Sequence, residues 1–359
     1  MSIERLVSIS QRYGKDPEYV LLGGGNTSLK KDGILYVKAS GHALSDIQAG
    51  GFAALDLEAL DQIWKRKYPD DDDQREAAVL EDLMACRLAE ETKRPSVEAL
   101  LHAILPFRYV VHLHPALVNG LTCSQEGEAA TARLFPHALW IELVKPGFIL
   151  AKTVRDRLGS HAKRTGSDAS VIFLENHGVF VGAETVDQID ALYAVIMKNL
   201  RAALVREVDT ASVSYDTKEV AAIFATLEKV SGEPISFHTN AEIMRLVSDE
   251  ESFASVASSF TPDHIVYAGF KPLWVDKAAA VEAEYQHFLR TYAEAPKVIC
   301  VAGFGAFSVT EKPMPLFLDT VAIAAYSESF GGPKFMSEEM IAFIRTWEVE
   351  QYRAQVAAK

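Results

Sequence analysis

The sequence predicts an α/β protein with a larger N-terminal domain and a smaller C-terminal one. Short apolar β patterns alternate with helical patterns up to about residue 206, and a second mixture of strands and helices begins near residue 238. The intervening stretch is more polar and contains the turn-forming sequence Ser231-Gly-Glu-Pro234. We therefore expect a layered domain at 1–206, a connecting segment at 207–237 and a small α/β domain at 238–359.

Hydrophobic periodicity assigns the elements of the N-terminal domain in chain order. The expected elements are a strand at 34–38, helices at 74–91 and 97–105, strands at 109–113, 171–174 and 178–181, and a long helix at 185–205. The acidic run Asp70–Asp73 precedes the first helix, where carboxylates favour the helix dipole. We interpret this run as a solvated loop or helix start, and not as a metal site.

The remaining elements are shorter and less regular. A helix is expected at 216–227, strands at 265–267 and 298–301, and a C-terminal helix at 337–356 with Ser337 as its cap. The segment Gly303-Phe-Gly305 resembles the start of a dinucleotide-binding loop but lacks the third glycine, so we expect an ordinary turn there.

The composition excludes several classes of protein. Its 49 acidic and 36 basic residues give a formal charge of -13, which disfavours nucleic acid as a partner. No apolar run approaches the roughly 18 residues needed to cross a membrane, and the N-terminus lacks the pattern of a signal peptide. We therefore expect a cytoplasmic protein without a membrane partner. Its three separated cysteines are expected to be buried thiols, so a bound metal would need nitrogen and oxygen ligands.

Three histidines form the candidate metal site. His112 and His114 alternate along an apolar strand, so their imidazoles share one face, and Pro115 places them at the end of that strand. A third nitrogen from His177, in Glu-Asn-His-Gly, leaves an open position on Zn²⁺ or another first-row divalent ion, as in catalytic sites. The alternative is a hydrogen-bonded pair of histidines in a polar core, which needs no metal.

Glu98 is the candidate general base. It is expected one turn into a helix that starts at Pro95 and Ser96, close in sequence to the histidine strand, where partial burial would raise its pKa toward neutrality. The alternative is an ordinary first-turn glutamate that stabilises the helix dipole. His102 follows by four residues on the same helix face, which favours a supporting or packing role over that of a fourth ligand.

Three segments together indicate a phosphorylated ligand. The glycines of Gly23-Gly-Gly-Asn-Thr-Ser28 allow a loop whose amides can surround an anion, although such a loop can equally be a tight turn. Lys38-Ala-Ser-Gly41 follows one strand later, and Ser96 is placed at a helix N-terminus, which favours phosphate.

These motifs resemble, in the same order, those of the class II aldolase and adducin family. The resemblance covers about residues 20–205 and rests on the glycine segment, Lys38-Ala-Ser-Gly41, Pro95-Ser-Val-Glu98, His112-Leu-His114 and Asn176-His-Gly178. Within the family, the chain is most similar to the aldolase part of bifunctional rhamnulose-1-phosphate aldolase/lactaldehyde dehydrogenases. That similarity includes Pro146-Gly-Phe-Ile-Leu-Ala151, Thr261-Pro-Asp263 and Pro272-Leu273, whereas the fused dehydrogenase part is absent.

The resemblance implies an α/β/α domain with a central, mainly antiparallel sheet and Zn²⁺ on His112, His114 and His177. It also implies cleavage of a ketose 1-phosphate to dihydroxyacetone phosphate and an aldehyde through a metal-stabilised enediolate. Glu98 would move the proton on the carbon of dihydroxyacetone phosphate. The positions that would bind the phosphate and substrate are Asn26, Ser40, Gly41 and Ser96.

Other members of the family leave alternatives open. The same fold serves pentulose-phosphate epimerases, a sugar-phosphate dehydratase and metal-free adducin-like binding modules, and many members are tetramers. The chain differs from the short sugar-phosphate aldolases at Val97, where they often have a second serine, and at Lys38-Ala39, where they commonly have threonine and proline. Lys38 is therefore a candidate to supply part of the positive charge facing a phosphate.

Overall fold

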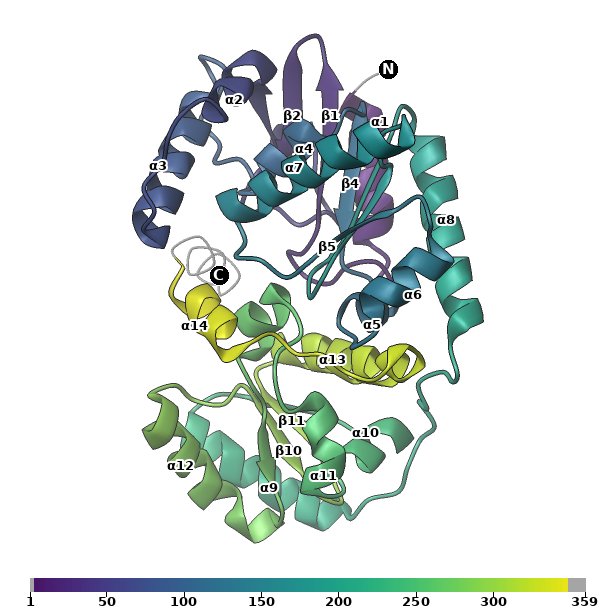
Figure 1. Ribbon diagram of the computed structural model, residues 1–359. Helices are drawn as coiled ribbons and strands as arrows, with labels where there is room; N and C mark the ends of the chain where they lie inside the picture. Colours follow the sequence, from purple (N-terminus) through teal and green to yellow (C-terminus); the bar gives the residue numbers. More distant parts are fainter. Residues whose placement is uncertain (1–2, 348–359) are drawn as a thin grey trace. The chain divides into compact units, whose positions relative to one another are not determined.

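The computed structural model describes residues 3–347, which form two compact units (Figure 1). Among the described residues, the N-terminal unit comprises 3–122, 127–203 and Trp347, and the C-terminal unit comprises Cys123–Glu126 and Leu204–Thr346. The segment 207–237, which we expected to be a connection, contributes the helix α9 (Thr217–Ser231) and most of the strand β8 (Ile235–His238) to the C-terminal unit.

A seven-stranded sheet forms the centre of the N-terminal unit, in the order β3-β2-β1-β4-β7-β6-β5. Neighbouring strands are antiparallel except β5 and β6, which confirms the expected mainly antiparallel sheet. The strands are β1 (Asn26–Lys31), β2 (Ile34–Lys38), β3 (Phe52–Asp56), β4 (Tyr109–Leu113), β5 (Leu139–Ile141), β6 (Val171–Leu174) and β7 (Gly178–Ala183).

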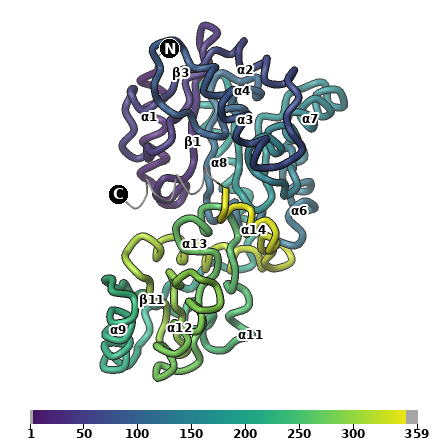
Figure 2. The backbone as a smooth tube through the Cα atoms, turned by 90° about the vertical axis from the view of Figure 1, so that its left-hand side faces the viewer, coloured from purple at the N-terminus to yellow at the C-terminus, as the bar shows by residue number. Residues whose placement is uncertain are grey.

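Helices cover both faces of this sheet and give the α/β/α layers (Figure 2). One layer contains α1 (Ile3–Gly14), α5 (Ala116–Thr122) and α8 (Val186–Ala203). The other contains α2 (Leu57–Ile63), α3 (Asp72–Ala85), α4 (Ala99–Ile104) and α7 (Phe148–Thr165), whose apolar residues share one core with the strands. The helix α6 (Gly127–Leu134) packs against α5. This second layer matters for function because α4 follows Glu98 directly.

Several helix boundaries differ from those expected, among them the end of α3 and the start of α4. The helix α3 ends at Ala85, before the predicted residue 91, because the chain then pairs with β3 through a bridge between Leu55 and Arg87. The helix α4 begins at Ala99, so Glu98 immediately precedes the helix and does not lie within its first turn. The acidic run was interpreted correctly, since Asp71 caps α3 by accepting a hydrogen bond from the backbone N–H of Gln74.

The C-terminal unit has a four-stranded sheet in the order β8-β11-β10-β9. Its other strands are β9 (Leu273–Val275), β10 (Val298–Val301) and β11 (Gly305–Val309), and the predicted turn at Gly303–Gly305 connects the last two as a hairpin. The helices α9 and α12 (Val281–Tyr292) pack on one another against the outer strands. The remaining helices are α10 (Ala241–Leu246), α11 (Glu250–Phe253), α13 (Pro313–Ser327), which packs on three strands, and α14 (Glu338–Thr346).

The expected strand at 265–267 is wrong, because His264–Ala268 forms a turn of π-helix. Every residue of this turn is buried, and a short fully buried run cannot be assigned to helix or strand by periodicity alone. The expected C-terminal helix begins as predicted, with the Ser337 hydroxyl accepting a hydrogen bond from the backbone N–H of Met340. It ends at Thr346, and the predicted helical residues beyond 347 lie outside the described part of the chain.

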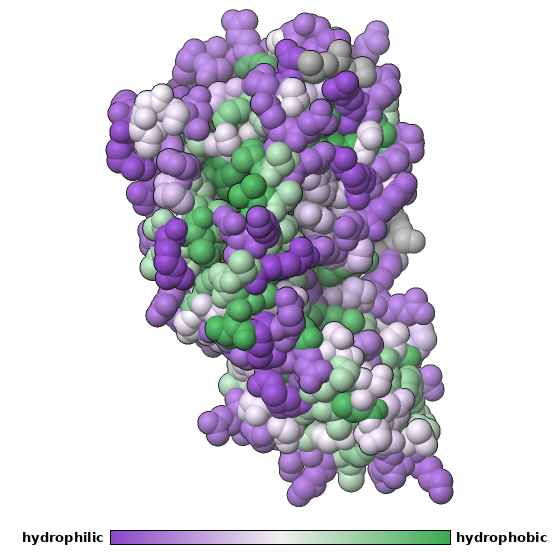
Figure 3. Space-filling view, turned by 90° about the vertical axis from the view of Figure 1, so that its right-hand side faces the viewer, coloured by the Kyte–Doolittle hydropathy of each residue, from purple (hydrophilic) through white to green (hydrophobic). Residues whose placement is uncertain are grey.

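The described residues show the distribution of exposed and buried side chains that is common in globular proteins. Across residues 3–347, none of the helices has the length and apolar character that crossing a bilayer requires. All three cysteines are buried thiols, as expected. One face of the molecule shows apolar side chains among hydrophilic ones (Figure 3). Val195 of α8 is 52% exposed. Scattered exposure of this kind is common on monomers and does not itself indicate a partner.

A candidate metal centre in the N-terminal unit

The three histidines come from two neighbouring strands of the central sheet. His112 is in β4, His114 directly follows that strand, and His177 is in the turn that connects β6 to β7. Because β4 and β7 pair with His112 opposite Phe180, the end of β4 lies beside the start of β7. The sheet register therefore brings together residues that are 65 positions apart in the chain.

The turn that carries His177 depends on its two neighbours. Asn176 adopts a positive φ of 54°, which asparagine tolerates better than most residues. Gly178 has a φ of 158°, and a Cβ atom there would lie 2.6 Å from the carbonyl oxygen of Leu113 and 2.7 Å from the ring of His114. The sequence Asn-His-Gly thus permits the close packing that places His177 against the other two histidines.

The Nε2 atoms of the three imidazoles point toward a common centre. The Nε2 atom of His112 lies 2.8 Å from that of His114 and 3.3 Å from that of His177. Nitrogen ligands of a tetrahedral Zn²⁺ lie about 3.3 Å apart when the Zn–N bonds are about 2.0–2.1 Å. These three residues can therefore hold a metal ion, and their ligand atoms all lie within 4.8 Å of one another.

The surroundings of His112 fit the role of a metal ligand. Its Nδ1 atom lies 3.1 Å from the carbonyl oxygen of Val179, an acceptor, so the ring nitrogen there must carry the proton. Burial lowers the pKa of His112 well below its ordinary value, so the ring is neutral and Nε2 carries a lone pair. Phe180 stacks on the ring with centroids 3.9 Å apart. A hydrogen-bonded Nδ1 that fixes the tautomer is typical of metal-binding histidines.

Glu98 faces the same centre. Its Oε1 atom lies 3.5 Å from Nε2 of His112 and 3.4 Å from Nε2 of His177, and accepts no hydrogen bond from the described residues. Burial opposes ionisation of Glu98, but electrostatic interactions with the facing imidazoles and a hydrogen bond from Asn26 outweigh it and hold the pKa of Glu98 below its ordinary value. A cation bound by the histidines would stabilise the ionised carboxylate further. The carboxylate is therefore ionised, contrary to the raised pKa that the sequence suggested.

A row of hydrogen bonds supports the other oxygen of this carboxylate. The side-chain amide of Asn26 donates to Oε2 of Glu98. His102 contacts the amide oxygen of Asn26 through Nε2 and the hydroxyl of Ser28 through Nδ1, the latter at 2.7 Å. Asn26 and Ser28 lie on one face of β1, and Asn26 pairs directly with His112 on β4. The side chain of Asn26, which we expected to bind substrate, is thus engaged with Glu98 and His102.

The three segments expected to bind phosphate lie beside one another. The Lys38 ammonium donates hydrogen bonds to the carbonyl oxygens of Gly23 and Gly25, at 2.9 and 2.8 Å. The backbone N–H of Ser96 donates to the carbonyl oxygen of Lys38, and the hydroxyl of Ser40 donates to that of Pro95. Lys38 therefore holds the glycine loop against the strand end that continues to Ser40 and Gly41.

Sequence reasoning missed how this neighbourhood is connected. His102 was noted only for its spacing from Glu98, and Lys38 only for its charge. The interaction of Lys38 with the glycine loop joins residues 13–15 positions apart across a β turn, and the link between His102 and Asn26 joins residues 76 positions apart. Neither has a local sequence signal, although alternation along Asn26-Thr-Ser28 does predict that its two ends share one strand face.

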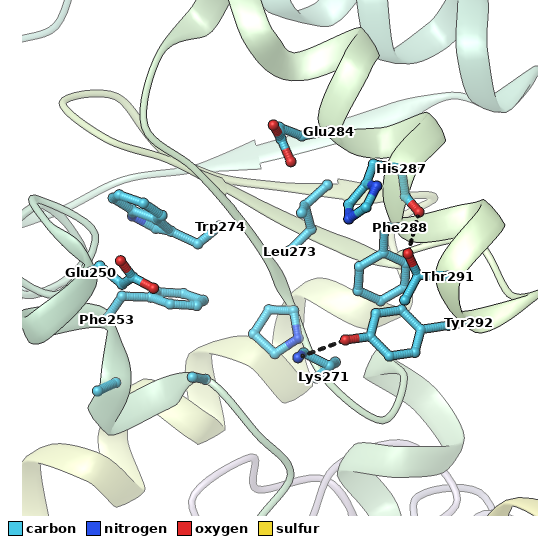
Figure 4. Close-up of a pocket in the computed structure, with 13 residues that line it drawn as sticks. Glu250, Phe253, Lys271, Leu273, Trp274, Glu284, His287, Phe288, Thr291 and Tyr292 are labelled. Atoms are coloured by element: carbon cyan, nitrogen blue, oxygen red, sulfur yellow. Dashed lines mark hydrogen bonds between the residues drawn. The ribbon is translucent and has the colours of Figure 1, made fainter.

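A second concave site lies within the C-terminal unit and has a different chemistry (Figure 4). It has a volume of about 360 Å³ and lies between α11, β9 and α12. Aromatic rings line it on two sides, with Phe253 and Trp274 on one and Phe288 and Tyr292 on the other. Lys271 donates a hydrogen bond to the hydroxyl of Tyr292. None of the three clustered histidines lines this pocket, so it is separate from the candidate metal centre.

Comparison with known proteins identifies the family. The family described as Class II Aldolase and Adducin N-terminal domain matches residues 4–204, which is more than half of the chain. The protein therefore belongs to the class II aldolase and adducin family. The match ends at the boundary between the two units, next to Ala203.

Individual relatives are distant. The chain is 24% identical over 412 residues to an uncharacterized oxidoreductase, YuxG, of Bacillus subtilis (strain 168), with 99% of this chain and 58% of that protein covered. Similar solved structures include the N-terminal class II aldolase domain of a conserved protein from Thermoplasma acidophilum, with 25% identity, a TM-score of 0.48, and coverage of 56% of this chain and 93% of that one. An L-fuculose-1-phosphate aldolase from Thermus thermophilus has 14% identity, a TM-score of 0.35, and coverage of 56% and 94%.

Proposed function

We propose that this protein is a zinc-dependent aldolase that cleaves a ketose 1-phosphate of the rhamnulose-1-phosphate type into dihydroxyacetone phosphate and an aldehyde. The observation that carries the proposal is the convergence of three histidine Nε2 atoms with one unbonded, ionised carboxylate oxygen of Glu98, at 3.4 to 3.5 Å from two of them. Metal ligands and a carboxylate in this arrangement suit a reaction that develops negative charge on substrate oxygens.

His112, His114 and His177 would hold the metal. Three neutral imidazoles leave the ion its full double charge and an open position, which is the arrangement of catalytic rather than structural zinc sites. A divalent cation bound there would act as a Lewis acid that stabilises the enediolate of dihydroxyacetone phosphate.

Glu98 would move the proton on carbon. In cleavage the C4 hydroxyl group would lose its proton, which the ionised Glu98 carboxylate would take up through solvent, and the bond between C3 and C4 would break to release the aldehyde and leave an enediolate. Glu98 would return a proton to C3, and in the reverse direction it would remove that proton. Its Oε1 atom is the one that faces the histidines, because Oε2 accepts the hydrogen bond from Asn26.

The glycine loop and the serines would bind the phosphate. Lys38 fixes the loop through two carbonyl oxygens, and amides of such a glycine loop can surround an anion. Ser40 and Gly41 lie on one chain segment beside the glycine loop, and Ser96 lies on a second. A β-bridge and backbone hydrogen bonds join these two segments. Asn26 is proposed to line the substrate site through the side-chain amide that also binds Glu98.

The rhamnulose-1-phosphate branch is supported by the resemblance of the segments at 146–151, 261–263 and 272–273, two of which lie in the C-terminal unit. The chain spans 58% of the length of its curated relative, so we propose the activity for this chain and not for that whole protein. By resemblance to the family we propose that the protein is a homo-oligomer, a tetramer, and from its composition we propose that it acts in the cytoplasm.

The test is a panel of ketose 1-phosphates and pentulose 5-phosphates, each incubated with the Zn²⁺-loaded protein and followed by NMR. We expect dihydroxyacetone phosphate and an aldehyde from at least one ketose 1-phosphate. A stereoisomer as the sole product would indicate an epimerase, and loss of water would indicate a dehydratase. Absence of any conversion would favour an adducin-like binding module. Each of these three results would contradict the aldolase proposal.

A further inference from the structure

His102 is a buried histidine. It contacts neither solvent nor the point that the three proposed metal ligands face. Its side chain is 0% exposed, and both ring nitrogens have partners. Nδ1 lies 2.7 Å from the hydroxyl of Ser28, and Nε2 contacts the amide oxygen of Asn26. The amide nitrogen of Asn26 in turn donates to Oε2 of Glu98. Four side chains from β1, α4 and the residue before α4 therefore form one continuous row.

The chemistry of the groups fixes the direction of every hydrogen bond in this row. Asn26 presents its NH₂ group to Oε2 of Glu98 and its amide oxygen to Nε2 of His102. An amide oxygen only accepts, so His102 must carry a proton on Nε2. Burial lowers the pKa of His102 to about 3, so the ring is neutral and Nδ1 accepts the hydroxyl proton of Ser28.

We propose that His102 is a positioning residue that acts through Asn26: its Nε2–H tautomer fixes the amide of Asn26 so that Oε2 of Glu98 is bound and Oε1 remains the oxygen that faces the histidine cluster. The inference rests on the proposed function only in treating Glu98 as the base. A reversed amide would place the Asn26 oxygen against the carboxylate, so the row permits one orientation of Glu98 and disfavours the other.

A role in packing alone would leave different traces. His102 meets the ring of Phe180 edge-on at 5.4 Å, and Phe180 stacks on His112, so the imidazole does fill space beside the site. Packing depends on the shape of the ring, which is the same in both tautomers. The positioning role instead requires one tautomer and one donor at Nε2, and these two requirements can be measured separately.

The first test is spectroscopic and does not depend on turnover. Protein labelled with ¹⁵N-histidine and loaded with Zn²⁺ is examined by long-range ¹H–¹⁵N correlation spectra between pH 6 and 8, and His102 is assigned by its absence from the His102→Gln variant. We expect a neutral Nε2–H ring throughout. An Nδ1–H tautomer or an imidazolium ion would overturn the proposal, because neither can complete the row of bonds with Asn26 and Ser28 as described.

The second test compares two amides at the same position. Glutamine can place its NH₂ group near the position of Nε2, whereas asparagine reaches only the position of Nδ1. His102→Gln should therefore keep kcat within a few-fold of the parent, while His102→Asn should lower kcat by about 10- to 100-fold with KM and zinc content unchanged. Equal losses of kcat in both variants would show that His102 contributes through packing alone. If the parent protein cleaves no ketose 1-phosphate, the proposed function fails, and the tautomer alone decides this inference.

Discussion

Two buried histidines, one in each unit, show which surroundings distinguish a metal ligand from a structural residue. His112 in the N-terminal unit is 0% exposed and His264 in the C-terminal unit is 2% exposed. Nδ1 of His264 lies 2.7 Å from the Thr261 hydroxyl, and Nε2, which makes no hydrogen bond among the described residues, faces a carboxylate oxygen of Asp319 at 3.2 Å. His112 has a carbonyl acceptor at Nδ1, but its Nε2 faces other imidazole nitrogens.

The difference lies in the balance of donors and acceptors. An imidazole between a hydroxyl and a carboxylate faces a group of complementary charge, so it does not call for a cation. Several imidazole nitrogens that converge beside a carboxylate provide more lone pairs than protons, and a cation resolves that excess. Burial of a histidine is therefore weak evidence of a metal site, whereas convergence of its lone pair with others is strong evidence.

The largest expected effect separates these two histidines directly. His112→Ala should reduce zinc affinity by more than about 100-fold, beyond the 10- to 100-fold typical of a residue that only supports a ligand, and should abolish turnover. His264→Ala removes the same atoms from an equally buried position and should lower Tm while zinc content stays at that of the parent. Elemental analysis of both purified variants gives the comparison. Equal zinc content in the parent and in His112→Ala would disprove the metal assignment.

The next effect concerns catalysis without metal loss. Glu98→Gln keeps the size of the side chain and removes its charge, so zinc content should stay constant while kcat falls by about 10²- to 10⁴-fold. Glu91 offers a matched control, because it is a glutamate of the same unit whose carboxylate binds Lys93 and a backbone N–H of β3. If kcat of Glu98→Gln falls no further than that of Glu91→Gln, the base lies elsewhere.

The smallest effect tests the turn that carries His177. Gly178→Ala would bring a Cβ atom within 2.7 Å of the His114 ring, so we expect weaker zinc binding together with a lower Tm. Gly33→Ala is the control, since Gly33 has a φ of 77° in a turn with no atom within 4 Å of the added Cβ. That control should show only backbone strain of about 1–2 kcal/mol and unchanged zinc binding. A loss of zinc affinity in both variants would show that the effect is general destabilisation.

Sequence reasoning recovered the parts of this protein that have local signals. The strands at 34–38, 109–113 and 171–174 were predicted with their exact bounds, because each is a short apolar run flanked by turn residues or glycines. The spacing in His112-Leu-His114 predicted a shared strand face, and His177 was expected between the strands at 171–174 and 178–181. These features follow from the chain itself and require no knowledge of distant contacts.

The features that sequence reasoning missed depend on tertiary structure. The ionised state of Glu98 is set by the charge and hydrogen bonds that face it, which the position of Glu98 next to a helix start cannot reveal. The π-helical turn at His264–Ala268 is set by its buried partners, including the contact between His264 and Asp319. In both places, groups far apart in the chain decide the local chemistry.

The most direct test of the central claim is proton exchange on carbon at the histidine cluster. Dihydroxyacetone phosphate is incubated in D₂O with the Zn²⁺-loaded protein, without an aldehyde, and its hydroxymethyl protons are followed by NMR. We predict that one of the two protons exchanges stereospecifically, and that the exchange is lost in His112→Ala and in Glu98→Gln. Exchange that persists in both variants, or no exchange with the parent protein while it holds zinc, would contradict the assignment of these residues to enediolate chemistry.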